Sequence, residues 1–202
     1  MKTIVLIPSR MASSRFPGKP MAKIDGKPMI QRVWQQAINS KVGEVIVACS
    51  ENEVLNLITS LGGKAILTDP KLQSGTDRIY SALMKINSTI EYDYIINLQG
   101  DIPNISPKTI KKLALIIRQK SVGMATLVSK IQNPKAVKDK NIVKAVFTKH
   151  FKFNKALYFS RTPIPFGARE FFEHIGIYAY KIDTLIEFVN LKYANYSIRS
   201  RK

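Results

Sequence analysis

Cysteine is nearly absent from this sequence, because Cys49 is the only one in 202 residues. A single cysteine excludes an internal disulfide, and its place at the end of the apolar run 45–49 favours an inert core thiol. Long apolar runs are also missing, since no stretch reaches the roughly 18 uninterrupted apolar residues that a membrane helix needs. The first apolar run, Ile4 to Ile7, stops at Pro8 and predicts a buried strand rather than a signal peptide. We therefore expect a cytoplasmic protein with no membrane partner.

Acidic residues are scarce as well. There are 14 of them against 32 lysines and arginines, which gives a formal net charge of +18. Such an excess indicates nucleic acid, an anionic surface or a phosphorylated ligand. The sequence has no zinc-finger spacing, no aromatic RNA-binding motif and no basic heptad helix, so we expect no specific nucleic-acid partner. The favoured interpretation is a solvated, lysine-rich surface, with the lysines densest at residues 135–144.

Apolar residues make up 45% of the chain, enough for one compact domain over residues 1–202. Their periodicity alternates between strand and helix. We predict strands at residues 3–8, 44–49, 64–68, 92–98, 122–129, 142–148, 156–159 and 174–182, and helices at residues 28–40, 52–61, 76–87, 107–120 and 184–191. This order predicts an α/β fold with a doubly wound, mostly parallel sheet. In such a fold the ligand binds beyond the C-terminal ends of the strands.

The loop at residues 8–20 follows the first predicted strand and is rich in cations. It carries Arg10, Arg15 and Lys19 together with Ser13 and a glycine. Fixed cations, hydroxyl groups and free backbone N–H groups are what a triphosphate needs. The loop is not a Walker A sequence, and the alternative is an ordinary exposed basic loop. The spacing of the three cations favours phosphate binding.

Two further loops carry polar residues where predicted elements meet. Gln99, Gly100 and Asp101 end the strand at 92–98, where a carboxylate could hold Mg²⁺ and a glycine would let a ligand approach the backbone; the alternative is a plain turn. The segment 73–78 opens a helix and could bind an anion or a base edge. An ordinary helix N-cap explains the second loop equally well.

Seven short segments together resemble the 3-deoxy-manno-octulosonate (Kdo) cytidylyltransferase family. They are RMASSRFPGKP (10–20), DGKPMI (25–30), QSGTDR (73–78), NLQGD (97–101), VGMATL (122–127), ALYFSR (156–161) and HIGIY (174–178). Each segment is weak evidence alone, but their order along residues 3–189 is specific. CMP-sialate synthetases and sugar-1-phosphate nucleotidyltransferases have related first loops and lack this set.

The resemblance implies a nucleotide-diphospho-sugar transferase-like fold, a homodimer, Mg²⁺ as cofactor, and CTP and Kdo as substrates. The implied products are CMP-Kdo, used in lipopolysaccharide biosynthesis, and pyrophosphate. By the same resemblance, Arg10, Ser13, Arg15 and Lys19 hold the triphosphate; Gln73, Ser74, Gly75, Gln99 and Gly100 bind the cytidine; Asp101 binds the metal; and Arg161, His174 and Tyr178 line the sugar-acid side. Without the resemblance, His174 and Tyr178 would be interpreted as core or strand-face residues.

The sequence departs from the family at two places. Ile102 and Pro103 follow Asp101, where the family has glutamate and proline. Family members also continue past residue 202 with a second metal-binding aspartate. The segment 190–202 is atypical, and its last residues, 197–202, match nothing in the family. The pair Asp183 and Thr184 resembles that later motif, but we interpret it as a helix N-cap. We therefore expect a domain without its C-terminal elements, and the alternative to an active enzyme is an impaired remnant that retains some CTP binding.

Overall fold

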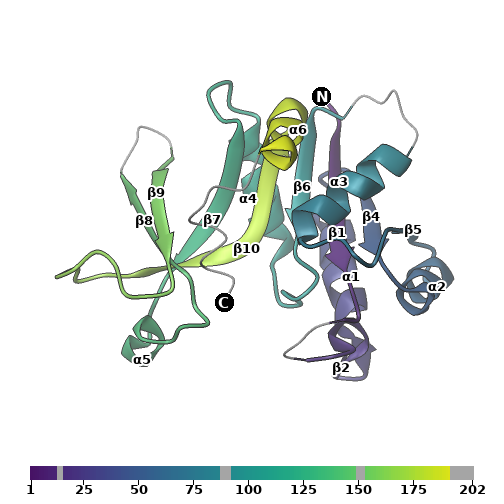
Figure 1. The fold of residues 1–202 in the computed structure, drawn as a ribbon, viewed down its shortest axis with the longest axis horizontal. Coiled ribbons are helices and arrows are strands. Elements are labelled where there is room, and N and C mark those ends of the chain that lie inside the picture. The colour runs from purple at the N-terminus through teal and green to yellow at the C-terminus, as the bar shows by residue number, and fades with distance from the viewer. Residues whose placement is uncertain (13–15, 87–91, 149–152, 192–202) are drawn as a thin grey trace.

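An eight-stranded sheet organises the part of the chain that the structure, a computed structural model, describes: residues 1–12, 16–86, 92–148 and 153–191 (Figure 1). The strands are hydrogen-bonded in the order β5 (Lys64–Leu67), β4 (Glu44–Cys49), β1 (Thr3–Ser9), β6 (Tyr94–Leu98), β10 (Phe172–Lys181), β8 (Lys144–Thr148) and β9 (Lys155–Ser160). Strand β7 (Met124–Lys130) also pairs with β10. All eight strands therefore belong to one continuous hydrogen-bonded sheet.

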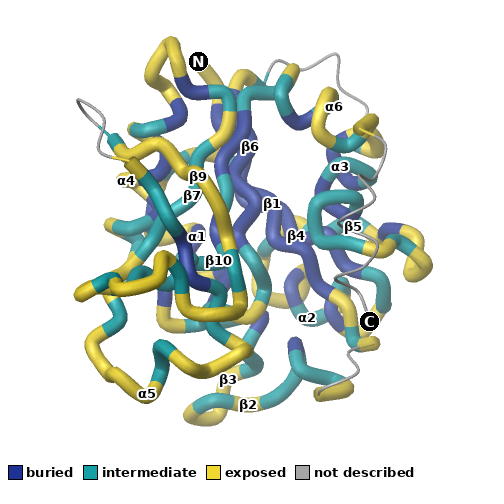
Figure 2. The backbone as a smooth tube through the Cα atoms, turned by 60° about the vertical axis from the view of Figure 1, so that its left-hand side comes forward, coloured by how far each residue is buried: buried dark blue, intermediate teal, exposed yellow. Residues whose placement is uncertain are grey.

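The four strands β5, β4, β1 and β6 are parallel, and the last three of them form the buried centre of the molecule. Every residue of β1 is buried, as expected for a strand covered by helices on both faces. Alternate side chains of β1 enter two separate core clusters, with Val5 and Ile7 in one and Ile4 and Leu6 in the other. Figure 2 shows this centre as the darkest, most buried part of the backbone.

Helices cover both faces of the parallel strands. On the side of Val5 and Ile7, the buried faces of α1 (Met29–Ser40), α2 (Asn52–Ser60) and α4 (Pro107–Ile117) pack on the sheet. On the opposite side lie α3 (Gly75–Lys85) and α6 (Ile182–Asn190). Since each predicted helix appears with its apolar face inward, the prediction of a doubly wound α/β fold is confirmed. No helix among the described residues is long and apolar enough to cross a membrane.

The second half of the sheet is antiparallel. Strand β10 pairs antiparallel with β6, β7 and β8, and β8 pairs antiparallel with β9. The pairing of β10 with β7 shifts register between Ile175 and Tyr178, which marks an irregularity in the long strand. Figure 1 shows β8, β9 and the short helix α5 (Pro134–Val137) on the opposite side of the molecule from α2 and β5. The central sheet is therefore mixed, with its parallel part where the site was predicted.

The segment between β1 and α1, which includes the basic loop at residues 8–20, contains short elements that periodicity does not reveal. A 3₁₀ helix, η1 (Lys19–Met21), is followed by a two-stranded ribbon of β2 (Lys23–Ile24) and β3 (Lys27–Pro28). Asp25 and Gly26 form the turn with φ values of 46° and 76°, the backbone that an Asp-Gly hairpin favours. The ribbon leads directly into α1.

Three predicted helix starts are corrected. Helix α3 begins at Gly75, one residue earlier than predicted. Helix α1 begins at Met29 with Pro28 as its N-cap, one residue later than predicted. Helix α6 begins at Ile182 with Lys181 as its N-cap, so the prediction that Asp183 and Thr184 form a cap is wrong. Asp183 lies in the first turn instead, where its charge suits the helix dipole without a capping hydrogen bond.

Candidate functional site

The C-terminal ends of β1 and β6 bring two of the predicted loops together. The two strands pair in parallel, with Leu6 opposite Asn97, so the chain after each strand leaves the sheet at the same edge. Gly100 shows how close the two chains lie, because a Cβ at this position would lie 2.8 Å from the Pro8 carbonyl oxygen. A side chain would not fit there, which explains the glycine.

Lys19 and Asp101 form an ion pair that joins the two loops. The Lys19 Nζ lies 2.8 Å from the Asp101 Oδ2, with the two side chains 34% and 52% exposed. Both groups are open enough to exchange this partner for a ligand. The sequence predicted one as a phosphate-binding cation and the other as a metal-binding carboxylate, and the structure places them in direct contact.

The first loop is closed by backbone hydrogen bonds. The Gly18 N–H donates to the Met11 carbonyl over 3.0 Å, and the Met11 N–H donates to Glu51 Oε2 over 3.0 Å. Glu51 is the N-cap residue of α2, yet its side chain does not cap that helix and instead holds the loop. Arg10 is exposed beside it. The predicted residues Ser13 and Arg15 lie outside the described residues.

Two neighbouring cavities open at this edge of the sheet. The first, here called the loop cavity, has a volume of about 480 Å³ and is lined by Pro8, Ser9, Arg10, Phe16, Lys19, Pro20, Leu72, Ser74, Gly75, Arg78, Gln99, Gly100, Asp101 and Asn141. The second, here called the sheet cavity, has a volume of about 570 Å³ and is lined by Gly75, Thr76, Gln99, Asp101, Met124, Asn141, Ile142, Val143, Glu173, His174, Gly176, Tyr178, Tyr180 and Phe188. They share Gly75, Gln99, Asp101 and Asn141, so the two cavities meet at Asp101.

The predicted segment at 73–78 is both a helix cap and part of the site. Ser74 Oγ accepts the Asp77 N–H over 3.1 Å, and Asp77 Oδ2 accepts the Ser74 N–H over 3.1 Å, which is a reciprocal capping box at the start of α3. Ser74 and Gly75 also line the loop cavity. Gln73 is exposed, donates to the Lys71 carbonyl over 3.2 Å, and within the described ranges lines neither cavity.

Arg78 lines the loop cavity, although no role was predicted for it from the sequence. It is only 2% exposed, and its Nη1 donates to Thr68 Oγ1 over 2.6 Å and to the Asp69 carbonyl over 3.2 Å. Burial lowers its pKa from the ordinary value for arginine. Its Nη2 has no hydrogen-bond partner among the described residues, and neither has the buried hydroxyl of Ser9. Both residues line the loop cavity, which makes these two unsatisfied groups candidates for contact with a ligand.

The sheet cavity contains two of the three predicted sugar-acid residues, His174 and Tyr178, both on β10. Their rings lie 5.2 Å apart, and Phe159 meets the His174 ring edge-to-face at 5.3 Å. Burial lowers the pKa of His174 and raises the pKa of Tyr178. Both side chains are therefore neutral at neutral pH, and they offer hydrogen bonds rather than charge to a ligand.

Arg161, the third predicted sugar-acid residue, is placed differently. It is exposed just beyond β9, its Nη1 donates to the Lys140 carbonyl over 2.9 Å, and within the described ranges it lines neither cavity. The buried Lys144 donates to the carbonyls of Asp139, Ile142 and Arg161 over 2.6, 2.9 and 3.0 Å. These contacts fasten the loop that carries Asn141 into both cavities. No motif in the sequence pointed to Asn141, because an asparagine after a run of charged residues is typical of a surface turn.

Asp101 is the predicted metal ligand. Among the described residues no group of three or more histidine, cysteine, aspartate or glutamate side chains could hold a metal ion. A single carboxylate still suits Mg²⁺, which keeps several waters and commonly takes one or two protein carboxylates together with substrate phosphates. The donor chemistry therefore fits a magnesium ion that arrives with a nucleotide, and it does not fit a metal held by the protein alone.

Parallel strands, a basic loop after the first of them, and a carboxylate where two cavities meet define a nucleotide-dependent transferase of the α/β class. The sequence profile of the family described as Cytidylyltransferase matches residues 4–198. The 3-deoxy-manno-octulosonate cytidylyltransferase of Paramagnetospirillum magneticum is 42% identical over 190 residues, covering 93% of this chain and 77% of the relative. That of Bartonella tribocorum is 39% identical over 202 residues, covering 100% of this chain and 83% of the relative.

Solved structures agree with these relatives. CMP:2-keto-3-deoxy-manno-octonic acid synthetase in complex with CTP superimposes with a TM-score of 0.88 at 37% identity, covering 100% of this chain and 83% of that one. A cytidylyltransferase from Leptospira borgpetersenii, 17% identical with a TM-score of 0.62, shares the fold. The chain belongs to the cytidylyltransferase family and, within it, to the 3-deoxy-manno-octulosonate cytidylyltransferases. The resemblance seen in the sequence is thereby confirmed, and none of the comparisons favours the impaired remnant.

Proposed function

We propose that this chain transfers CMP from CTP to 3-deoxy-manno-octulosonate and releases pyrophosphate. The anomeric hydroxyl oxygen of the sugar acid bonds to the α-phosphorus, the bond from that phosphorus to the bridging oxygen breaks, and the hydroxyl proton is lost. One observation carries the proposal: Lys19 and Asp101 form an ion pair at the point where the two cavities meet. A cation and a carboxylate are needed where the nucleotide phosphates meet the second substrate.

The loop cavity suits CTP. Lys19 and Arg10 line it, and they would neutralise the negative charge that builds on the leaving pyrophosphate. By resemblance, Arg15 on the same loop takes the same role, and Ser13 helps to hold the triphosphate. The unpartnered Nη2 of Arg78 and the hydroxyl of Ser9 would donate to the acceptors of the cytosine ring. Gly75 and Gly100 also line this cavity, at positions where a Cβ would press on Gln99 and on Pro8.

Asp101 would hold Mg²⁺ together with the phosphate oxygens of CTP. When bound, such an ion polarises the phosphates and stabilises the charge on the leaving group. Binding of a cation at Asp101 would also free Lys19 from its ion pair, so that its ammonium could turn to the triphosphate. The chain's own contribution is thus to place one cation and one carboxylate within reach of the same phosphates.

The sheet cavity suits the sugar acid. His174 and Tyr178 line it beside Gln99, and they offer hydrogen-bonding groups to a polyhydroxylated ligand. Arg161 would act by fastening the loop of Asn141, since its guanidinium is bonded to the Lys140 carbonyl. Direct contact of Arg161 with the substrate carboxylate stays a prediction from the resemblance.

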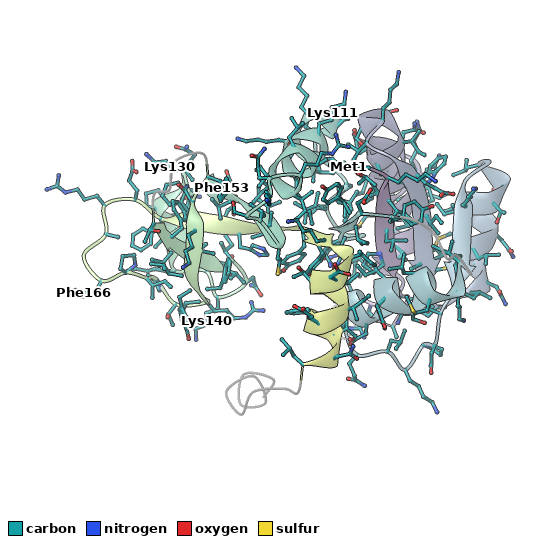
Figure 3. All side chains as sticks on the ribbon, turned by 90° about the horizontal axis from the view of Figure 1, so that it is seen from above. Met1, Lys111, Lys130, Lys140, Phe153 and Phe166 are labelled. Carbon is teal, nitrogen blue, oxygen red and sulfur yellow. The ribbon has the colours of Figure 1, made fainter. Side chains whose placement is uncertain are left out.

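We also propose that the chain forms a homodimer through its antiparallel half. Leu157 and Tyr158 on β9 are 56% and 66% exposed, and Phe166 beyond it is fully exposed. Figure 3 shows Phe166 at the outer end of the molecule, pointing away from the sheet. A second copy of this chain would cover these apolar groups, as the resemblance implies. We also propose that the chain acts in the cytoplasm, where CTP is available. By the same resemblance, its product is used in lipopolysaccharide biosynthesis.

The function is tested by measuring pyrophosphate release from CTP with Kdo and Mg²⁺. We expect turnover that requires all three components, with Asp101→Asn losing the Mg²⁺ dependence of CTP binding. Asp25→Asn is the matched control, because Asp25 is also exposed and paired, with Arg32 at 2.7 Å, but lines neither cavity within the described ranges. Turnover without Kdo, or an Asp101→Asn variant with unchanged Mg²⁺ dependence, would contradict the proposed site.

A further inference from the structure

The hydroxyl of Thr126, on β7, has three polar neighbours. Its Oγ1 lies 2.7 Å from the Ile177 carbonyl oxygen, 3.3 Å from the Ile175 carbonyl oxygen and 2.9 Å from Nε2 of His174. The register shift between β10 and β7 falls at this point, and it turns these two carbonyls of β10 toward the same hydroxyl. The contacts therefore arise from the course of the backbone and not from a chance side-chain rotamer.

These distances determine where the protons lie. A threonine hydroxyl has one proton to donate and two lone pairs to accept with, whereas a carbonyl oxygen can only accept. Two oxygens 2.7 Å apart need a proton between them, so the Thr126 proton points to the Ile177 carbonyl. The hydroxyl then has no proton left for His174. The contact between Oγ1 and Nε2 must instead be an N–H donated by the imidazole.

We infer that Thr126 holds His174 as the neutral tautomer protonated on Nε2, so that Nδ1 faces the sugar-acid side of the site as a hydrogen-bond acceptor. This inference rests on the proposed function for its ligand, a hydroxyl group of the sugar acid. Thr126 is a positioning residue, since it acts on the substrate through His174. The role differs from a charge pair, in which a protonated histidine would bind the substrate carboxylate.

Three observations support the assignment. Nδ1 has no hydrogen-bond partner among the described residues, and His174 lines the sheet cavity, so this nitrogen is the one left for a ligand. Phe159 and Tyr178 contact the ring at 5.3 and 5.2 Å, which limits its rotation. Burial lowers the pKa of His174 and so favours the neutral ring, which a fixed tautomer requires.

The chain offers a direct test, because it has only two histidines. Nitrogen-15 labelling of the imidazoles and a long-range proton–nitrogen spectrum at mildly alkaline pH distinguish the two neutral tautomers. His150→Gln assigns the remaining signals to His174. We expect the Nε2–H pattern in the unmodified chain and in Thr126→Ser, which keeps the hydroxyl. In Thr126→Val we expect the Nδ1–H pattern or a mixture, because Nε2–H has lost its acceptor.

Kinetics test the role of the tautomer. We expect Thr126→Val to raise the KM for Kdo about tenfold, the range for one lost hydrogen bond, with the KM for CTP unchanged and with recovery in Thr126→Ser. An Nδ1–H pattern in the unmodified chain overturns the inference, and so does an Nε2–H pattern that persists in Thr126→Val. If Thr126→Val does not fold, the unmodified chain and Thr126→Ser still decide the tautomer. Absence of any turnover in the unmodified chain would count against the proposed function, while the spectra would still report on Thr126.

Discussion

Two buried cations, Lys144 and Arg78, show how hydrogen bonding distinguishes a structural role from a ligand-binding role. Burying a charge is costly unless the group is well hydrogen-bonded. Lys144 uses its three donors on three backbone carbonyls and is satisfied within the protein. Arg78 has bonds on Nη1 but none on Nη2 among the described residues, and it lines the loop cavity. The unsatisfied donor is the reason that we propose Arg78, and not Lys144, as a ligand-binding residue.

Arg78→Lys keeps the positive charge and removes the planar donor pair. We expect the KM for CTP to rise about tenfold or more, the range for a hydrogen bond to a charged group, with the KM for Kdo unchanged. Initial rates over both substrates would measure this. Arg32→Lys is the matched control, since Arg32 pairs with Asp25 and, within the described ranges, lines neither cavity. A loss of stability with unchanged CTP kinetics would show that Arg78 has a structural role only.

Lys19 tests the phosphate-binding loop. We expect Lys19→Ala to lower turnover on the order of 10²-fold, about 3 kcal/mol of transition-state stabilisation, because it removes a cation facing the leaving pyrophosphate. By resemblance, we expect Arg15→Ala to lower turnover to a similar extent. Lys23→Ala is the control, because Lys23 is an exposed lysine four positions along the chain that lines neither cavity within the described ranges. Equal effects of Lys19→Ala and Lys23→Ala would reduce the loop to a solvated basic surface.

At the scale of elements, the site depends on how closely β1 and β6 end beside each other. Gly100→Ala would place a methyl group 2.8 Å from the Pro8 carbonyl oxygen, and a backbone atom cannot move aside cheaply. We expect this change to cost about 1–3 kcal/mol of unfolding free energy, the usual range for overpacking, and to lower turnover. Denaturant unfolding and the pyrophosphate assay would measure both effects.

Gly75→Ala supplies the comparison. Its new methyl group would lie 3.2 Å from Gln99 Nε2 and 3.2 Å from Pro8 Cγ, which are side-chain atoms, and alanine favours the helix that Gly75 begins. We expect a smaller loss of stability than in Gly100→Ala. If the two variants were equally stable, the close approach of β1 and β6 would not be what requires glycine at position 100.

The elements also show which features a sequence can predict. Apolar periodicity predicted β1, β4 and β6 and the helices around them, because the pattern of each element lies within one continuous stretch of the sequence. It did not predict that β10 would pair antiparallel with three strands, since that pairing joins segments far apart in the chain. Three of the four residues shared by the two cavities came from motifs, but Asn141 is held there by Lys144 and Arg161, contacts that no local pattern reveals.

For the whole molecule, the groups whose pKa changes on folding determine how stability depends on pH. Burial lowers the pKa of His174 below its ordinary value of about 6.5, so the unfolded chain binds this proton first as the pH falls. The hydrogen bond from Lys64 lowers the pKa of Glu44, whose stabilisation is present above its ordinary value and is lost as the pH falls further. Both effects reduce stability on the acid side.

On the alkaline side, buried tyrosines help to determine how the free energy of unfolding changes with pH. Burial raises the pKa of Tyr180 to about 12, above the value of about 10 for an exposed phenol. The unfolded chain therefore loses this proton first as the pH rises above about 10, and stability falls until the folded phenol also ionises. Burial also raises the pKa of Cys49 to about 11, from an ordinary value of about 9. We therefore expect a plateau of unfolding free energy between about pH 6.5 and 9, with a fall on each side. Denaturant unfolding at a series of pH values would trace this curve.

Two variants test which groups cause the fall on each side. His174→Gln should flatten only the upper part of the acid limb, and Tyr180→Phe should flatten only the alkaline limb. An acid limb that is unchanged in His174→Gln would mean that His174 titrates alike in the folded and unfolded chains. That result would contradict a neutral imidazole held between Thr126 and the sheet cavity.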